Sequence, residues 1–123
     1  MSTTSARDMA LEIAARIEGA GAVIVKRLFG GAAVVTDGVQ IGFVMKGSFY
    51  LRVDDASRAA FEALGSSPFA YAGGSGTVTV ASYYEAPDEI LEDAERLREW
   101  VANARRASIA ERRRPIARRK HTS

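Results

Sequence analysis

Residues 34–53 read VVTDGVQIGFVMKGSFYLRV, a run of β-branched and apolar residues that two turn-forming pairs interrupt. Asp37-Gly38 is typical of a type I′ turn, in which both central residues have positive φ and the flanking strands form a tight hairpin. Lys46-Gly47 marks a second tight turn. Apolar residues alternate with others around these turns, so we predict strands over 39–45 and 48–53. We expect Val39, Ile41, Phe43 and Met45 to share one face of their strand, and Phe49, Leu51 and Val53 to face inward.

Similar patterns extend the sheet in both directions. Upstream, 22–28 and 32–36 are predicted strands, separated by Gly30-Gly31. Downstream, we predict a short edge strand over 69–72 and a longer strand over 77–84. Helices are indicated where apolar residues recur at spacings of three and four. We predict them over 7–18, after a cap at Asp54 or Asp55, just after Pro87, and along the stripe formed by Leu97, Trp100, Val101, Ala104 and Ser108.

The predicted order of elements is α-β-β-β(β)-α-β-β-α. Strands joined by tight turns pair antiparallel. The sequence therefore predicts the α+β class, an antiparallel sheet with helices packed on it. Every periodic apolar face lies within 1–108, so we predict one domain over 1–108 and a basic, disordered tail over 109–123.

The composition excludes several classes of protein. The 123 residues are 47% hydrophobic, enough for one core without disulfides. Cysteine is absent, which excludes thiolate metal ligands and fits a reducing compartment. The N-terminus is polar, and no stretch approaches the roughly 18 apolar residues of a membrane span. We expect a soluble, cytoplasmic protein without a membrane partner.

Residues suited to catalysis or metal binding are scarce. The one histidine, His121, lies two residues from the end of the chain, where nothing would hold its imidazole rigidly beside a nucleophile. One His and no Cys do not supply the usual zinc ligands. The glycine clusters match no phosphate-binding motif. We expect no catalytic residue, no cofactor and no metal.

Charge is divided unevenly along the chain. Residues 1–104 hold nine Lys and Arg against 14 Asp and Glu, a net charge of −5. Residues 105–123 hold eight against one, a net charge of +7. Such a tail predicts weak, sequence-blind binding to nucleic acid, and the alternative is a solubilising terminus. The candidate nucleic-acid contacts are Arg112, Arg113, Arg114, Arg118, Arg119 and Lys120.

Two segments of the body combine charged and aromatic residues. In Arg27 to Gly31, a cation and Phe29 precede a bare backbone that either binds an anion or reverses the chain while Phe29 packs in the core. Tyr50, Arg52 and Asp54 alternate with inward-facing residues. They form a surface that recognises a partner, an ordinary solvated face, or a face covered by a helix in which Arg52 pairs with Asp54.

Tyr83 and Tyr84 lie on opposite faces of their strand. One is predicted in the core and the other near an edge, where tyrosine suits an interface. Trp100, the only tryptophan, is predicted to be a core residue of the last helix. The candidate interaction surface comprises Arg27, Phe29, Gly30, Gly31, Tyr50, Arg52, Asp54, Tyr83 and Tyr84.

Four motifs in this order resemble the TfoX N-terminal domain family. They are RLFGG at 27–31, YLRVD at 50–54, SYYEAP at 82–87 and LREW at 97–100. The resemblance runs from about Lys26 to about Ala107. It implies a compact sheet-and-helix domain similar in layout to secretion-chaperone folds. The best-known members of the family regulate natural competence and influence transcription.

Three functions follow as hypotheses. The first, implied by the resemblance, is a non-enzymatic regulatory domain with a protein partner such as the transcription machinery. The second is a nucleic-acid accessory protein that binds through the tail. The third is an enzyme or small-ligand module that uses Arg27, Tyr50, Arg52 and Tyr83. A homodimer is also expected, because short strands leave an edge near 69–72 that needs cover.

Overall fold

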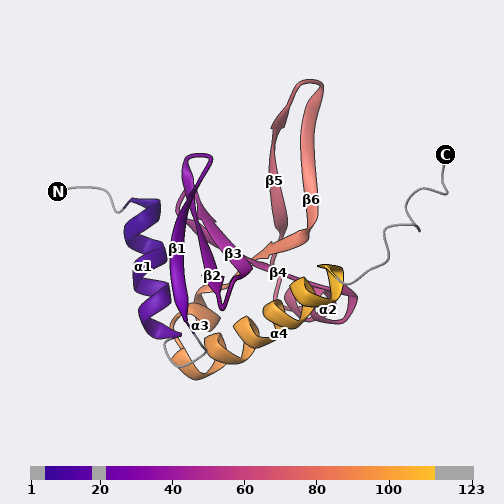
Figure 1. Cartoon of the computed structure of the whole chain (residues 1–123). Helices are drawn as coiled ribbons and strands as arrows, with labels where there is room; N and C mark the ends of the chain where they lie inside the picture. Colours follow the sequence, from indigo (N-terminus) through magenta and orange to yellow (C-terminus); the bar gives the residue numbers. More distant parts are fainter. Residues whose placement is uncertain (1–4, 18–21, 113–123) are drawn as a thin grey trace.

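A computed structural model describes residues 5–17 and 22–112 of the chain. It contains a six-stranded antiparallel sheet and four helices, so the predicted α+β class is confirmed (Figure 1). The elements are α1 (Ala6–Arg16), β1 (Val23–Leu28), β2 (Gly31–Thr36), β3 (Val39–Met45), β4 (Ser48–Arg52), α2 (Asp55–Ala63), β5 (Pro68–Gly73), β6 (Gly76–Glu85), α3 (Asp88–Leu91) and α4 (Ala94–Arg112). None of the helices within these described ranges is long and apolar enough to cross a membrane.

The strands lie in the order β1-β2-β3-β4-β6-β5. The first four form the predicted meander, and β5 is an edge strand, as expected for 69–72. Asp37 and Gly38 have φ values of 48° and 81°, the positive pair that a type I′ turn requires. The Asp37 carboxylate accepts a hydrogen bond from the Ala22 backbone N–H at 2.9 Å, which ties this turn to the start of β1.

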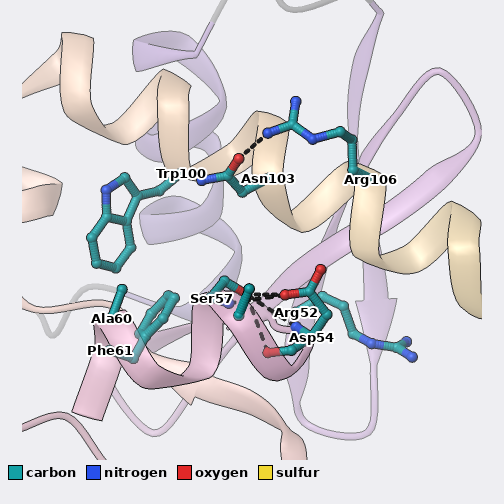
Figure 2. A pocket seen from close by; sticks show the side chains of 9 residues that line it. Arg52, Asp54, Ser57, Ala60, Phe61, Trp100, Asn103 and Arg106 are labelled. Atoms are coloured by element: carbon teal, nitrogen blue, oxygen red, sulfur yellow. Dashed lines mark hydrogen bonds between the residues drawn. The ribbon is translucent and has the colours of Figure 1, made fainter. Parts of the chain in front are cut away.

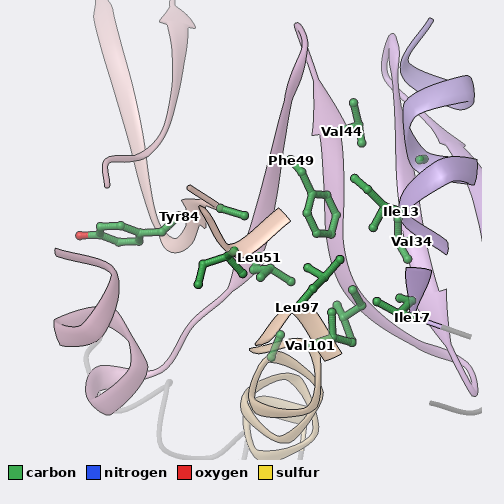
Figure 3. Close-up of a cluster of buried hydrophobic side chains, with 14 of the residues drawn as sticks. Ile13, Ile17, Val34, Val44, Phe49, Leu51, Tyr84, Leu97 and Val101 are labelled. Carbon is green, nitrogen blue, oxygen red and sulfur yellow. The ribbon is translucent and has the colours of Figure 1, made fainter. Parts of the chain in front are cut away.

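Helices cover one face of the sheet. Ile13 and Ile17 come from the α1 side of the core, and Leu97 and Val101 come from α4 (Figure 3). They pack on inward-facing strand residues, of which Val34, Val44, Phe49 and Leu51 are fully buried. The inward orientation predicted for Phe49, Leu51 and Val53 is therefore confirmed.

The face predicted for β3 is wrong in its second half. Val34 pairs with Gly42 and Val35 pairs with Gln40, so Ile41 is an extra residue between two ladder pairs. Such a bulge shifts the alternation by one position. Val39 and Ile41 therefore face the core, whereas Phe43 and Met45 face away from the helices rather than sharing that face, and Val44 lies in the core.

The predicted cap of α2 is Asp54. Its Oδ1 accepts a hydrogen bond from the Ser57 backbone N–H at 2.9 Å, and the Ser57 hydroxyl accepts one from the Asp54 backbone N–H at 3.0 Å. This reciprocal pair is a capping box. The hydrogen bond from the Ser57 backbone N–H to the carboxylate is the main reason that the pKa of Asp54 lies below its usual value of 3.8.

The C-terminal part of α4 packs against the sheet. The Ser108 hydroxyl donates to the Gln40 carbonyl oxygen at 2.9 Å, and Ile109 packs against the core. Trp100 is half-buried rather than fully enclosed, with its ring 4.5 Å from that of Phe61. Because α4 continues to Arg112, the domain boundary at 108 stays a prediction.

Candidate functional site

The face of the sheet opposite the helices contains an aromatic recess of about 610 Å³. None of the described residues that line it belongs to a helix. Its lining consists of Leu28, Phe29, Gln40, Phe43, Met45, Lys46, Tyr50, Phe69, Ala70, Tyr71, Val80 and Tyr83. We call this set the aromatic recess. Five of its members are aromatic rings drawn from β3, β4, β5 and β6, in addition to Phe29 at a turn.

The rings contact one another in a continuous cluster. Phe43 and Tyr50 are direct cross-strand partners, with ring centroids 5.4 Å apart and planes at 27°. Phe69 stands edge-on to both, at 5.0 Å from each centroid. Tyr83 lies 4.9 Å from Phe43, and Tyr71 lies 5.9 Å from Phe69. Offset and edge-on ring contacts add stability beyond that of burial alone, so they hold the walls of the recess in place.

Polar groups are few and have defined roles. The Gln40 side-chain amide donates to the Tyr83 hydroxyl at 3.3 Å. Burial, and secondarily the negative charge of Glu85, raise the pKa of Tyr50 above its usual value of 10.0, so its phenol keeps its proton at neutral pH. Lys46 contributes the formal positive charge of the lining. The recess is therefore an apolar surface with hydroxyl and amide groups suited to orienting a bound group.

The β5–β6 hairpin extends the recess beyond the body of the domain. β6 pairs with β4 only through Tyr83, Tyr84 and Glu85, so the rest of the hairpin projects past the other strands (Figure 1). Tyr71 and Val78 face each other across the hairpin and are 47% and 39% exposed. The projecting part thus presents apolar side chains on the side of the recess.

Phe29 contradicts the reading that placed it in the core. It is 91% exposed at the turn between β1 and β2. Its φ of 38° and the φ of 88° at Gly30 form another turn with two positive φ values. Asn, Asp or Gly is preferred in such a turn, and a bulky residue is strained there. Packing within the domain therefore does not account for a phenylalanine at this position.

The two glycines that follow Phe29 have conformational roles, whereas Arg27 lies at the surface. Gly30 supplies the positive φ of the turn. A Cβ atom at Gly31 would collide with the Val44 carbonyl oxygen, so Gly31 permits β2 and β3 to approach. Arg27 is exposed, but it pairs with Ala32, a core residue, and so lies on the helix-covered side of β1 rather than beside the recess.

The remaining candidates of the sheet lie apart from one another. Arg52 stands 5.6 Å from the Tyr83 ring centroid and forms an ion pair with Glu111 at 3.4 Å, not with Asp54. Tyr84 is buried, and its hydroxyl donates to the Glu62 carboxylate at 2.7 Å, a contact that raises the pKa of Tyr84. The opposite faces predicted for the two tyrosines are confirmed, with Tyr84 in the core and Tyr83 at the recess.

A second pocket of about 420 Å³ lies between α2 and α4 (Figure 2). Arg52, Asp54, Ser57, Trp100 and Arg106 contribute to its walls. Asp54 and Ser57 are engaged in the capping box, and the Arg106 guanidinium donates to the Asn103 side chain. Because Asp54, Ser57 and Arg106 already have partners within the pocket, it offers less to a ligand than the aromatic recess does.

Sequence reasoning found part of the recess and missed the rest. Phe29, Tyr50 and Tyr83 are candidates that the structure brings together there. Phe43, Phe69 and Tyr71 were not among the candidates, because the bulge conceals the face of Phe43 and the β5–β6 hairpin carries no charged motif. Arg113, Arg114, Arg118, Arg119 and Lys120 lie outside the described residues, and Arg112 ends α4.

Comparison with known proteins gives one family. The model of the TfoX N-terminal domain matches residues 15–108, which is most of the chain and includes every strand of the sheet. No curated protein matches the sequence. The recess, the turn that carries Phe29 and all four sequence motifs fall inside the matched range. The chain belongs to the TfoX N-terminal domain family.

Proposed function

We propose that this protein is a non-enzymatic regulatory domain that binds a protein partner through the aromatic recess. The observation that supports the proposal most strongly is Phe29, an exposed phenylalanine at a strained turn beside an apolar recess. Backbone strain of this kind costs on the order of 1–3 kcal/mol and persists where function uses it. When a partner covers an exposed aromatic side chain, apolar area leaves water, and this burial stabilises the complex.

The composition of the recess favours a protein over a small polar ligand. Tyrosine and phenylalanine are enriched in the buried centres of protein interfaces, where charged residues are depleted. The recess follows this pattern, since it is bounded by aromatic rings with Lys46 at its margin. Tyr71 combines exposure with a rigid ring and a polar tip, the properties of residues that dominate binding energy.

The chemistry of the recess supports a binding role. Among the residues that the structure describes, its lining offers tyrosine hydroxyls, an amide and an ammonium group, but no carboxylate and no imidazole. A general base that acts near neutral pH is usually a carboxylate, an imidazole or a lysine whose pKa is strongly lowered. The third hypothesis, an enzyme that uses Arg27 with Tyr50 and Tyr83, is further weakened because Arg27 lies on the other side of β1.

Family membership supports a regulatory role of the kind that competence regulators perform. In this role the domain acts in the cytoplasm as an adaptor, and the transcription machinery is the partner that the family suggests. The recess supplies the contact surface for such an adaptor, because it lies opposite the face that the helices need for the core.

Site-specific photo-crosslinking tests the proposal. A benzophenone-bearing phenylalanine analogue at position 71, on the recess side of the hairpin, should give discrete protein adducts in the native host. The matched control carries the same group at Thr79, which is exposed on the opposite side of the hairpin. Equal adducts at both positions, or none at position 71, would refute binding through the recess.

The tail carries a second candidate function. The net charge of +7 over residues 105–123 favours weak binding to nucleic acid through phosphate contacts. This binding does not require the recess, so the two functions are compatible in one chain. Its dependence on salt distinguishes it from binding through the apolar recess.

A further inference from the structure

We propose that the partner at the aromatic recess is a second copy of this chain, bound across a two-fold axis. The inference rests on the proposed function, because it names the protein that the recess binds. Three features of the chain favour a copy of itself: the charge pattern of the β5–β6 hairpin, the unequal protection of the two sheet edges, and the presence of both complementary parts on one face.

The hairpin lacks the charged residues that usually keep a solvent-exposed element soluble. No charged residue occurs from Ala63 to Tyr84, although 26% of the chain is charged. Yet most of the projecting hairpin is exposed, including the apolar side chains of Tyr71 and Val78. An uncharged, projecting and partly apolar element is typical of a surface that is covered in the working assembly.

The two edges of the sheet are protected unequally. The edge strand β1 carries Lys26 and Arg27, and charged side chains on an edge strand oppose pairing with other strands. The other edge strand, β5, reads PFAYAG and has no charge, and only its first residue is a proline. The β5 edge is therefore open to contact with another chain, and this edge belongs to the hairpin that extends the recess.

Both halves of a complementary contact lie on one face. Phe29 projects at one end of the recess, and the apolar side of the hairpin lies at the other end. A two-fold axis through this face sets the Phe29 end of each copy on the hairpin end of the other, so that every contact occurs twice. Lys46, at the Phe29 end, then meets an uncharged hairpin rather than another Lys46.

The surface available to a second copy is continuous. The described lining of the recess comprises 12 residues, and Val78, on the same side of the hairpin as Tyr71, extends it toward the hairpin end. None of these residues belongs to a helix, so dimerisation requires no rearrangement of the core.

Sedimentation equilibrium of the full chain over a range of concentrations tests the inference. We expect a species of twice the 13.2 kDa chain mass. Val78→Lys, on the recess side, should weaken association by about tenfold or more, because it places an unpaired charge in an apolar contact. Thr79→Lys is the matched control, because it adds the same charge to the opposite side of the same strand and should leave association unchanged.

The outcomes separate this inference from the proposed function. A chain that stays monomeric at high micromolar concentration overturns the inference, as does a dimer that Val78→Lys and Thr79→Lys affect equally. The mass of the crosslinked adduct at position 71 then decides about the function. An adduct with a different protein supports binding through the recess with another partner, and no adduct at all overturns both.

Discussion

Phe43 stacks on Tyr50 across the β3–β4 pair because Ile41 has no partner on β2. Without the extra residue, uninterrupted alternation would place Phe43 on the same face as Ile41, in the core. The bulge therefore supplies the central ring of the aromatic recess, and Val44 fills the position that Phe43 leaves. One irregularity in one strand thus determines the chemical character of both faces of the sheet.

Replacing Phe29 with asparagine should stabilise the isolated domain. Asn tolerates the positive φ at this position, and the exposed Phe29 ring contributes little burial, so the free energy of unfolding should rise by roughly 1 kcal/mol. Chemical denaturation at low protein concentration measures the change without a contribution from association. Phe29→Ala is the control and should give no comparable gain, since alanine does not favour a left-handed backbone. A clear loss of stability in the asparagine variant would mean that Phe29 packs within its own domain.

Replacing Trp100 with alanine should destabilise the domain by about 2–3 kcal/mol. This is less than the 3–5 kcal/mol typical of fully buried aromatic residues, because Trp100 is only half-buried beside Phe61. Thermal unfolding measures the loss, and Trp100→Phe should recover much of it by restoring a ring at the same site. A melting temperature within a degree or two of wild type would show that the contact with Phe61 contributes nothing.

Asp54 should make stability depend on pH at the acidic end. Its pKa is lower in the folded state than in the unfolded chain, so its contribution is present above the unfolded value of 3.8 and is lost as pH falls through the lower folded value. At neutral pH, Asp54→Ala should cost about 1 kcal/mol through loss of the cap. Asp54→Asn is the matched control, since asparagine caps the helix without titrating. If the Ala variant lost as much at pH 2 as at pH 7, the carboxylate would not be the source of the effect.

The sequence allowed the strands to be predicted wherever turn chemistry is local. Asp37-Gly38 and Lys46-Gly47 mark their own turns, and Asp54 marks the start of α2, because each signal acts within a few residues. The bulge at Ile41 depends on how β2 and β3 pair, which no local pattern reveals. The face of Phe43 was therefore assigned wrongly, although the strand itself was found.

The candidate site was harder to predict for a related reason. Tyr50 and Tyr83 were found because they sit in recognisable motifs, but their partners Phe69 and Tyr71 lie in an uncharged hairpin that reads as an ordinary edge. Phe29 was assigned to the core because large apolar residues are usually buried. Its exposure follows from its place in a two-residue turn with positive φ, where the side chain lies outside the core.

The basic tail should bind nucleic acid with a steep dependence on salt. With about six to eight cations engaged on duplex DNA, the log–log slope of affinity against salt should be roughly −5 to −7. Replacing the six candidate contacts, Arg112, Arg113, Arg114, Arg118, Arg119 and Lys120, with serine should abolish binding. Replacing the five arginines among them with lysine is the control and should retain most of it. Filter binding or anisotropy over a salt series measures the slope, and retention that ignores salt would exclude the tail as the contact.

The exposure of Phe29 in living cells tests the central claim most directly. Hydroxyl-radical footprinting can compare oxidation of Phe29 and Tyr71 in cells with oxidation in dilute purified protein, with the exposed Leu11 of α1 as an internal reference. If the aromatic recess binds a partner, Phe29 and Tyr71 should be oxidised several-fold less in cells while Leu11 is unchanged. Equal oxidation of Phe29 in both conditions would contradict the account, because the ring would then remain in solvent where the protein works.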